Sequence, residues 1–229
     1  MVQQTRQHKT DETRAKILVV DDHPIVRKGL ENLINYEKDL MVCQQVEDAH
    51  EAMKAIDKLK PDIVIVDISL KDKNGLELIK SIKIQHPDLP ILALSMHDES
   101  LYAERVIRAG AKGYIMKQQA TENIVKAIRK VLNGQPYLSD RMTAKMMHKL
   151  VGRKKEKTEA SITELLSDRE LEVFLLIGKG YGTRQIANRL HLSVKTIESY
   201  RAHIKEKLSL SSATELLQYA IQWATSRIE

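Results

Sequence analysis

Residues 16–24 read Lys-Ile-Leu-Val-Val-Asp-Asp-His-Pro, an apolar run that ends directly in two carboxylates. The same pattern returns at Ile63–Val66, which Asp67 follows, and at Ile91–Leu94, which Ser95 follows. Short, continuous apolar runs of this kind are typical of strands buried on both faces, as the central strands of a parallel sheet are. The sequence therefore predicts a parallel sheet whose strands end in polar residues.

Outward from these runs, strand-like and helix-like segments alternate along the chain. With two weaker runs added, the expected strands are Ile17–Val20, Leu40–Gln45, Ile63–Val66, Ile91–Leu94 and Gly113–Met116. The segments with helical period are His23–Asn35, Ala49–Leu59, Gly75–Gln85, Ser100–Ala109 and Thr121–Asn133. This alternation predicts an α/β domain, a five-stranded doubly wound parallel sheet with helices on both faces. We expect it to span residues 16–137, after a flexible tail over residues 1–15.

Beyond Gln135 and Pro136 the alternation stops. We expect a linker over residues 138–162, with a possible helix at Asp140–Val151 and a charge run over 152–159. Residues 163–229 are helical in pattern and predict a small all-α domain of four helices, near 168–178, 183–190, 193–208 and 212–226. The candidate N-terminal caps are the capping-box pairs Ser167 with Glu170 and Ser212 with Glu215, and the single residues Thr183 and Ser193.

Charge and composition narrow the function classes. The net charge is +6, of which residues 1–144 carry +1 and residues 145–229 carry +5. The basic C-terminal part suits contact with a phosphate backbone, although a solvated helical surface explains it equally well. Cys43 is the only cysteine, which excludes a disulfide framework and a thiolate metal cluster, and we expect it in the buried core of its strand. No apolar run suits a signal peptide or a membrane span, so we expect a cytoplasmic protein without a membrane partner.

The polar residues that follow the strands are expected to meet. Asp21 and Asp22 follow the first strand, Asp67 the third, Ser95 the fourth and Lys117 the fifth, and ligands of open α/β sheets bind at this edge. Three clustered carboxylates repel one another unless a cation such as Mg²⁺ binds them. Asp67 could then act as a nucleophile that forms an acyl phosphate, with Lys117 as a cation and Ser95 as a hydroxyl donor for the phosphoryl oxygens.

Each of these residues also has a simpler role open to it. Asp22 alone is better explained as the cap of the first helix, and Ser95 and Lys117 alone as ordinary loop and surface residues. The joint arrangement favours a site.

Several motifs resemble the signatures of receiver domains, in order and with the family spacing. They are Val19–Pro24, Ile65–Asp67 with Gly75 eight residues on, Leu94-Ser95, and Gly110–Lys117. The resemblance covers about residues 16–135 and implies the strand order 2-1-3-4-5. It further implies that Asp67 is the phosphoacceptor, that Asp21, Asp22, Asp67 and the Ser69 backbone carbonyl bind the metal, that Ser95 and Tyr114 form a switch pair, and that Lys117 contacts the phosphoryl group. The chain has Lys71 and Gln118 where the family commonly has proline, so a cis bond after Lys117 is not implied.

The C-terminal module predicts a helix-turn-helix over residues 183–205. The expected inward apolar set is Ile186, Leu190, Val194, Ile197, Ile204 and Leu208. Ala187 is small where two helices approach, and His191 occupies a turn position where a left-handed backbone is expected. The predicted DNA contacts are Arg184, Lys195, Thr196, Glu198, Ser199 and Lys205. An ordinary amphipathic helix with a solvated face is the alternative on pattern alone.

The segments Leu166–Val173, Leu192–Arg201 and Lys207-Leu208 resemble the LuxR-type DNA-binding domain. With the receiver-like part, the chain resembles response regulators of the NarL/FixJ group. This resemblance implies a sensor histidine kinase as phosphodonor, Mg²⁺ as cofactor, a double-stranded DNA operator, and a homodimer when active. It also implies no enzyme activity beyond the protein's own phosphotransfer and dephosphorylation.

Two rival functions can be weighed. A phosphatase of the haloacid-dehalogenase type would carry Asp-x-Asp after the first strand and a cap domain, whereas here Asp21 and Asp22 are adjacent and the length leaves no room for a cap. A receiver that senses a ligand without phosphorylation is the second rival. The full acidic set and Lys117 argue against it.

Overall fold

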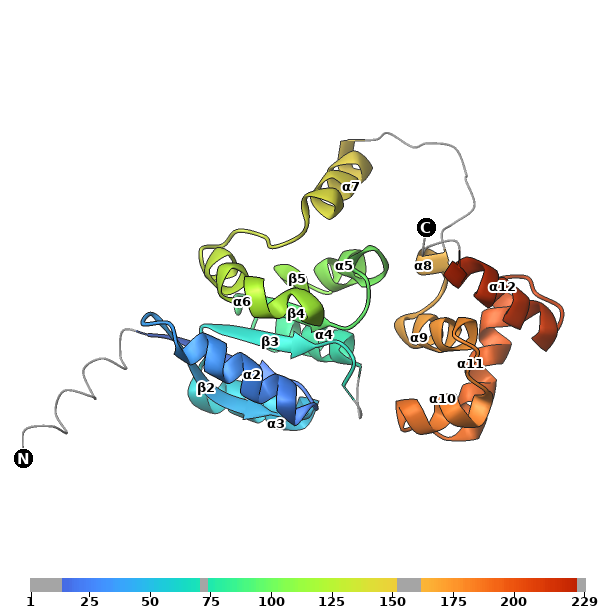
Figure 1. Ribbon diagram of the computed structural model, residues 1–229, viewed down its shortest axis with the longest axis horizontal. Helices are drawn as coiled ribbons and strands as arrows, with labels where there is room; N and C mark the ends of the chain where they lie inside the picture. The colour runs from blue at the N-terminus through green and yellow to red at the C-terminus, as the bar shows by residue number, and fades with distance from the viewer. Residues whose placement is uncertain (1–13, 71–73, 152–161, 226–229) are drawn as a thin grey trace, which may run out of the picture. The chain divides into compact units, whose positions relative to one another are not determined.

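The computed structural model describes residues 14–70, 74–151 and 162–225. The chain divides into two compact units, residues 1–152 and 153–229, drawn in Figure 1 and described here one at a time. Most of the expected tail, Lys71 and the charge run at 152–159 lie outside the described residues.

The first unit contains a five-stranded parallel sheet of order β2-β1-β3-β4-β5, which confirms the predicted fold and strand order (Figure 1). Its strands are β1 (Ala15–Val20), β2 (Leu40–Val46), β3 (Ile63–Asp67), β4 (Ile91–Ser95) and β5 (Gly113–Met116). β1, β3 and β4 lie inside the sheet, and the apolar runs predicted for them are fully buried, as continuous apolar runs require. Each expected strand is present with bounds within two residues of those predicted.

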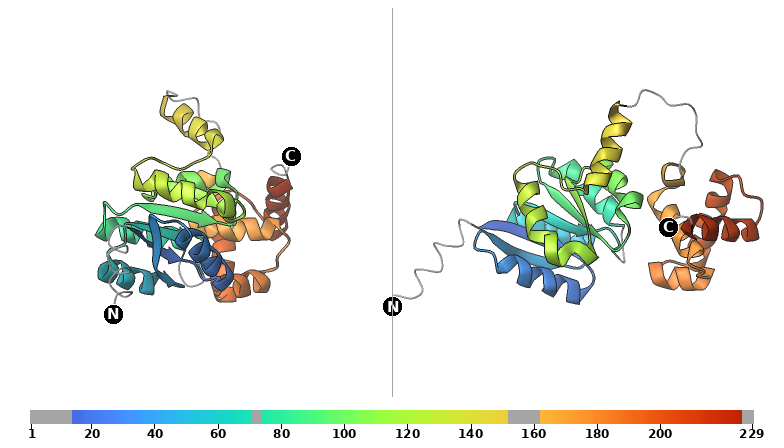
Figure 2. Two further views of the ribbon diagram at one scale, coloured as in Figure 1. Left: turned by 60° about the vertical axis from the view of Figure 1, so that its left-hand side comes forward. Right: turned by 45° about the horizontal axis from the view of Figure 1, so that its top comes forward.

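Helices cover both faces of this sheet, as the views in Figure 2 also show. They are α2 (Pro24–Asn35), α3 (Ala49–Leu59), α4 (Gly75–Gln85), α5 (Glu99–Arg108) and α6 (Lys117–Leu132). Ile17 and Val19 of β1 pack in one core with residues of α2 and α6. The intervening residue Leu18 points to the opposite face, where α3, α4 and α5 follow one another. The sheet is therefore doubly wound.

Two local expectations are wrong. Cys43 is only half-buried, because β2 forms an edge of the sheet. Helix α6 begins at Lys117 rather than Thr121. The turn from Lys117 to Ala120 contains a single apolar residue and therefore shows no helical period. The peptide bonds of the described residues are all trans, including the bond after Lys117.

The chain continues along the outer edge of β5 before it leaves the sheet. Tyr137 forms a parallel bridge with Gly113, in which the Tyr114 N–H donates to the Tyr137 carbonyl (2.9 Å) and the Tyr137 N–H to the Lys112 carbonyl (3.0 Å). A Cβ on Gly113 would lie 2.9 Å from the Tyr137 Cβ, so the close approach needs glycine. Helix α7 (Asp140–Val151) follows with the bounds expected for the possible linker helix.

The second unit is all-α, as predicted. It contains α9 (Asp168–Gly178), α10 (Thr183–Leu190), α11 (Val194–Lys207) and α12 (Ala213–Thr225), and a short additional helix α8 (Ile162–Leu165). Ser167 and Glu170 form the predicted capping box, and Ser193 and Ser212 accept the predicted cap bonds from Thr196 and Glu215. The predicted cap at Thr183 is wrong, since Gly182 precedes the helix and Thr183 is its first residue.

The core of this unit joins the helix-turn-helix to the flanking helices. Ile186, Ile197 and Ile204 are fully buried, whereas Val194 is 40% exposed and does not belong to the inward set. His191 has the expected left-handed backbone, with φ of 52°. In addition, the Lys207 Nζ lies 2.6 Å from a carboxylate oxygen of Glu170, which ties α11 to α9.

Candidate functional site

The carboxyl ends of three strands bring the predicted acidic residues and lysine together. Asp21 and Asp67 are fully buried and Asp22 is 6% exposed. Lys117, the first residue of α6, places its Nζ 2.7 Å from Asp21 Oδ2 and 2.7 Å from Asp67 Oδ2. The Ser69 N–H donates to Asp67 Oδ1 at 3.0 Å, so both oxygens of Asp67 have a defined partner. The spacing along the sequence and the geometry agree on this cluster.

Burial and charge shift the pKa values of two members in defined directions. Burial, and then the negative charge of Asp21, hold the pKa of Asp67 above its ordinary value, against the opposing effect of Lys117. Burial lowers the pKa of Lys117, but the charges and hydrogen bonds of Asp67 and Asp21 outweigh it, so that the pKa lies above its ordinary value. The lysine therefore stays charged, and the pocket contains more negative than positive side-chain charge.

Gly75 explains why helix α4 can begin beside Asp67. A Cβ on Gly75 would lie 2.1 Å from the Asp67 carbonyl oxygen and 2.6 Å from the Ile68 Cα. The Gly75 N–H donates to the Ile68 carbonyl at 3.1 Å. Any side chain here would push α4 away from the end of β3, which carries Asp67, and from the loop that carries Ser69.

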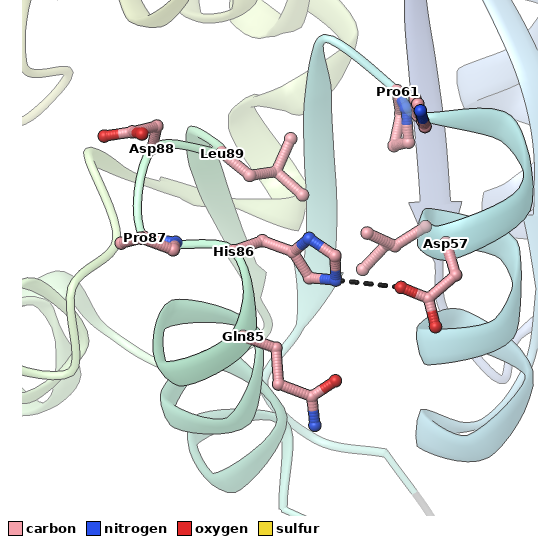
Figure 3. A pocket seen from close by; sticks show the side chains of 9 residues that line it. Asp57, Pro61, Gln85, His86, Pro87, Asp88 and Leu89 are labelled. Carbon is pink, nitrogen blue, oxygen red and sulfur yellow. Dashed lines mark ion pairs between the residues drawn. The ribbon is translucent and has the colours of Figure 1, made fainter.

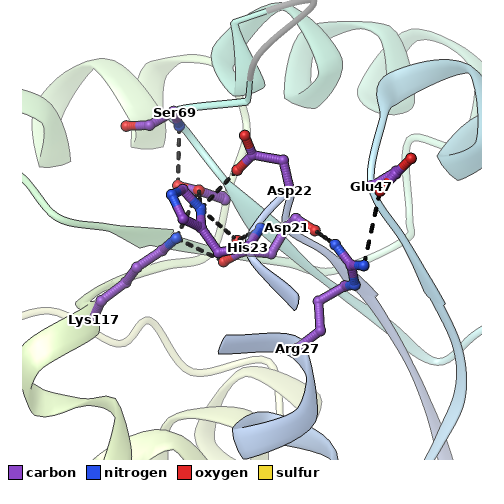
Figure 4. Close-up of polar contacts among 8 residues, drawn as sticks. Asp21, Asp22, His23, Arg27, Glu47, Ser69 and Lys117 are labelled. Carbon is purple, nitrogen blue, oxygen red and sulfur yellow. Dashed lines mark hydrogen bonds and ion pairs between the residues drawn. The ribbon is translucent and has the colours of Figure 1, made fainter. Parts of the chain in front are cut away.

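Asp22 does not cap the first helix. The N-cap of α2 is His23, and its side chain accepts no cap hydrogen bond within the described residues. Asp22 instead points at the cluster, and Asp22 Oδ1 lies 2.7 Å from His23 Nδ1. The backbone of the neighbouring residue Asp21 is also fixed, since its carbonyl oxygen accepts a hydrogen bond from Arg27 Nη1 at 2.5 Å (Figure 4). The capping role considered for Asp22 is therefore wrong.

His23 is a residue that the sequence analysis missed. Its ring turns in among the carboxylates (Figure 4), and its Nδ1 also lies 3.1 Å from Asp21 Oδ1 and 3.9 Å from Asp67 Oδ2. The only sequence signal for a role in the site was its position directly after the Asp21-Asp22 pair. The alternation of strand-like and helix-like segments does not show in which direction its ring points.

The donor set fits a divalent cation. The ligand-type atoms of Asp21, Asp22, His23 and Asp67 all lie within 4.8 Å of one another. The cluster is rich in carboxylate oxygens, which are the protein ligands that Mg²⁺ prefers, and this ion usually keeps several water ligands in addition. Charge supports the same assignment, because Lys117 alone does not balance three carboxylates.

Ser95 at the end of β4 and Tyr114 in the neighbouring strand β5 share a contact residue, His97. Ser95 is fully buried, and its Oγ accepts from the His97 N–H at 2.9 Å. Tyr114 is 2% exposed, and its hydroxyl donates to the His97 carbonyl at 2.8 Å. Burial raises the pKa of Tyr114. The tyrosine therefore points inward in this conformation.

A separate hollow of about 450 Å³ lies away from this cluster, lined by residues near the C-terminal ends of α3 and α4 (Figure 3). Across it, His86 Nε2 lies 3.1 Å from Asp57 Oδ1, which links the two helices. None of the predicted site residues lines this hollow.

In the second unit, the predicted contact residues lie on α10 and α11. Arg184, Lys195, Glu198 and Ser199 are exposed, whereas Thr196 and Lys205 are partly buried. Thr196 belongs to the Ser193 cap through a hydroxyl contact of 2.8 Å, and the Ser199 hydroxyl donates to the Lys195 carbonyl at 3.1 Å. The outward face of α11 therefore presents short polar and charged side chains near its N-terminal end.

Arg201 and Arg169 are candidate ion-pair partners of Glu198 within the same unit. Arg169 instead pairs with Glu172 at 2.9 Å. Glu198 makes no ion pair with any residue in the described ranges. Within the described part of the chain, its exposed carboxylate is therefore available to an external group.

In the described part of the chain, no helix combines the length and the apolar character that a membrane span requires.

Comparisons with known proteins account for both units. The family described as response regulator receiver domain matches residues 17–129, and the family of bacterial regulatory proteins, luxR family, matches residues 164–220. The chain is 37% identical over 210 residues to the oxygen regulatory protein NreC of Staphylococcus carnosus, covering 90% of this chain and 97% of the relative. This chain belongs to the response regulators.

Solved response regulators share the fold of this regulator. RcsB from Salmonella enterica serovar Typhimurium, bound to promoter P1flhDC in the presence of the phosphomimetic BeF₃⁻, is 27% identical with a TM-score of 0.61, covering 90% of this chain and 98% of that one. A LuxR-family regulator from Aurantimonas is 33% identical with a TM-score of 0.56, covering 61% and 99% respectively. The regulator thus joins a receiver domain to a LuxR-type DNA-binding domain and controls transcription in a phosphorylation-dependent way.

Proposed function

We propose that Asp67 is the residue of this regulator that accepts a phosphoryl group, and that a sensor histidine kinase donates it. The observation that carries the proposal is the buried cluster in which Lys117 Nζ lies 2.7 Å from both Asp21 and Asp67. An Asp67 oxygen forms the bond to phosphorus while the bond between phosphorus and the kinase histidine nitrogen breaks. The product is an acyl phosphate.

The other residues of the pocket have supporting roles in this proposal. Asp21, Asp22, Asp67 and the Ser69 carbonyl would hold Mg²⁺, which when bound supplies positive charge to the incoming phosphoryl group. Lys117 exchanges part of its contact with Asp67 for a phosphoryl oxygen and so stabilises the product. Apart from its own phosphotransfer and dephosphorylation, the regulator performs no catalysis in this proposal.

Ser95 and Tyr114 would transmit the change. The Ser95 Oγ now accepts from the His97 N–H, and Tyr114 donates to the carbonyl of the same residue. A phosphoryl oxygen at Asp67 accepts from the Ser95 hydroxyl and draws its Oγ away from the His97 N–H, which alters both contacts of His97. Phosphorylation then shifts the population of the receiver toward a state that forms a homodimer.

The C-terminal domain would read a double-stranded DNA operator with α11. Lys195, next to the cap at Ser193, suits a phosphate, whereas Glu198 and Ser199 lie one turn deeper and suit base edges. Arg184, Thr196 and Lys205 complete the proposed contacts. We assign residues 16–137 to the receiver, 138–162 to the linker and 163–229 to the DNA-binding domain, with 1–15 as a tail. A DNA operator as the target supports a cytoplasmic location.

The test of the proposal is phosphorylation of the full chain by a labelled small phosphodonor, with and without Mg²⁺. Wild type should form a hydroxylamine-sensitive phosphoryl group, and Asp67→Asn should fall to background. Asp62→Asn is the matched control. Asp62 directly precedes the N-terminal end of β3, whereas Asp67 lies at the C-terminal end, and the Asp62 side chain accepts from the Lys16 N–H. Equal labelling of Asp67→Asn, or labelling unaffected by removal of Mg²⁺, would contradict the proposal.

A further inference from the structure

The imidazole of His23 lies among the carboxylates of the acidic cluster. Its Nδ1 is 2.7 Å from Asp22 Oδ1, 3.1 Å from Asp21 Oδ1 and 3.9 Å from Asp67 Oδ2. The ring therefore approaches a carboxylate oxygen of all three acidic residues, and Figure 4 shows it turned inward rather than out along α2.

These separations have the size expected of donor atoms around one metal ion. With metal–ligand bonds of about 2.1 Å, neighbouring donors of an octahedral site lie about 3.0 Å apart and opposite donors about 4.2 Å apart. The two shorter His23 distances match neighbouring positions, and the distance to Asp67 approaches the opposite one. The nitrogen thus completes a set with the carboxylate oxygens with little rearrangement.

Lys117 and His23 share only one of these oxygens. The Lys117 Nζ contacts Oδ2 of Asp21 and Oδ2 of Asp67, whereas the two oxygens nearest to His23 Nδ1 are Oδ1 of Asp22 and Oδ1 of Asp21. The backbone holds the histidine in place, because the His23 N–H donates to Asp21 Oδ1 at 2.8 Å and Pro24 fixes the first position of α2. The side chain remains 55% exposed, so a metal ion can reach it from solvent.

We propose that His23 Nδ1 is a nitrogen ligand of this site, and that the site consequently binds first-row transition-metal ions such as Co²⁺ in preference to Mg²⁺. Mg²⁺ takes oxygen ligands and gains little from imidazole, whereas the affinity of mixed nitrogen and oxygen sites rises from Mn²⁺ through Co²⁺ to Ni²⁺. This inference rests on the proposed metal site beside Asp67. It adds which ion that site prefers and which residue decides the preference.

The test measures binding of Co²⁺ and of Mg²⁺ to the full chain by calorimetry, with the visible absorption of Co²⁺ as a second readout of nitrogen ligation. The variant is His23→Asn, since asparagine is a favourable N-cap that preserves the start of α2. His50→Asn, an exposed histidine on α3, is the matched control for non-specific binding. Asp22→Asn identifies the heat that belongs to this site.

We expect His23→Asn to weaken Co²⁺ binding about tenfold or more and to leave Mg²⁺ binding nearly unchanged, since only Co²⁺ gains from the imidazole. Its Co²⁺ spectrum should also lose intensity, and His50→Asn should behave like wild type. Unchanged Co²⁺ affinity and spectrum in His23→Asn would overturn the inference. So would tighter Mg²⁺ binding alone, because the ring would then act only as a charge that the metal displaces.

The proposed function fails in a different way. If wild type and Asp22→Asn show the same heats with both ions, there is no metal site beside Asp67, and both proposals are overturned. If Mg²⁺ binds and only the Co²⁺ effect is missing, the phosphorylation site stands without the role of His23.

Discussion

The acidic pocket of the receiver and the outward face of α11 differ in how their charges are satisfied. In the pocket, Asp21, Asp67 and Lys117 are almost fully buried and contact one another. On α11, Lys195 and Glu198 are exposed, and Glu198 has no ionic partner in the described ranges. Removal of a buried charge that contacts an opposite charge is expected to change the free energy of unfolding. Removal of an exposed charge is expected to change the binding of another molecule instead.

The largest expected effect is a loss of folding stability caused by a change in the buried acidic pocket. Lys117→Met removes the cation that contacts both Asp21 and Asp67 and leaves the buried carboxylates uncompensated. We expect the receiver to lose about 3–5 kcal/mol of unfolding free energy without Mg²⁺, which chemical denaturation measures. Addition of Mg²⁺ should restore part of the loss.

The control for this variant is Lys126→Met, which changes a lysine on the same helix that is in contact with neither Asp21 nor Asp67. It should stay within about 0.5 kcal/mol of wild type. A comparable loss in both variants would mean that lysines of α6 matter for a reason other than the pocket.

The next largest effect is expected on DNA binding by the exposed face of α11. Glu198→Ala should leave folding stability unchanged but lose about 1–3 kcal/mol of discrimination at one base position, because its carboxylate can accept from a cytosine amino group. It should also bind bulk DNA more tightly, since an acidic group near phosphates opposes binding. Affinities for the operator and its single-base variants, measured across a salt series, check both statements. Uniform weakening with unchanged base preference would indicate a purely structural role.

A smaller effect concerns acidity in the pocket. The pKa of Asp67 is raised in the folded state, so the folded protein binds this proton more tightly than the unfolded chain does. The resulting stabilisation is fully present below the ordinary pKa of an aspartate. It is lost as the pH rises through the pKa that Asp67 has in the folded state. We therefore expect Asp67→Asn to melt a few degrees above wild type at neutral pH without Mg²⁺. Thermal melts from pH 7 downward should show the difference shrinking as Asp67 becomes protonated. A variant less stable than wild type at neutral pH would contradict the direction.

The smallest effect is that of Lys195→Ala. Its charge lies in the first turn of α11, where it suits a phosphate, so its loss should weaken all DNA sequences alike. The slope of log affinity against log salt should fall by about one counterion. A change confined to one operator position would instead make Lys195 a base contact.

The sheet could be predicted well from the sequence because a short, continuous apolar run between polar segments suits a buried strand better than an amphipathic helix. Ile63–Val66 and Ile91–Leu94 reappear as central strands, and their order brings Asp67 and Ser95 to the expected edge. Spacing alone could not show side-chain direction. The inward ring of His23 depends on a rotamer, and the sequence does not encode it in any period.

The error at Val194 has a similar physical cause. Val194 fits the helical period of the inward set, but it begins α11, where the adjoining turn leaves it open to solvent. The inward orientation of Tyr114, whose hydroxyl donates to the His97 carbonyl, is likewise not encoded in any sequence period. A pattern of residue types predicts a site, but not which of two packing states the site occupies.

The bridge between Tyr137 and Gly113 bears on solubility. Strands at the edge of a sheet expose unpaired N–H and C=O groups, which other chains can use to extend the sheet. Here the Tyr137 backbone pairs with Lys112 and Tyr114 along the outer edge of β5. A receiver fragment cut at residue 129, where the family match ends, would lack this cover. Residues 135–139 thus protect the domain against edge-to-edge aggregation as well as leading to the linker.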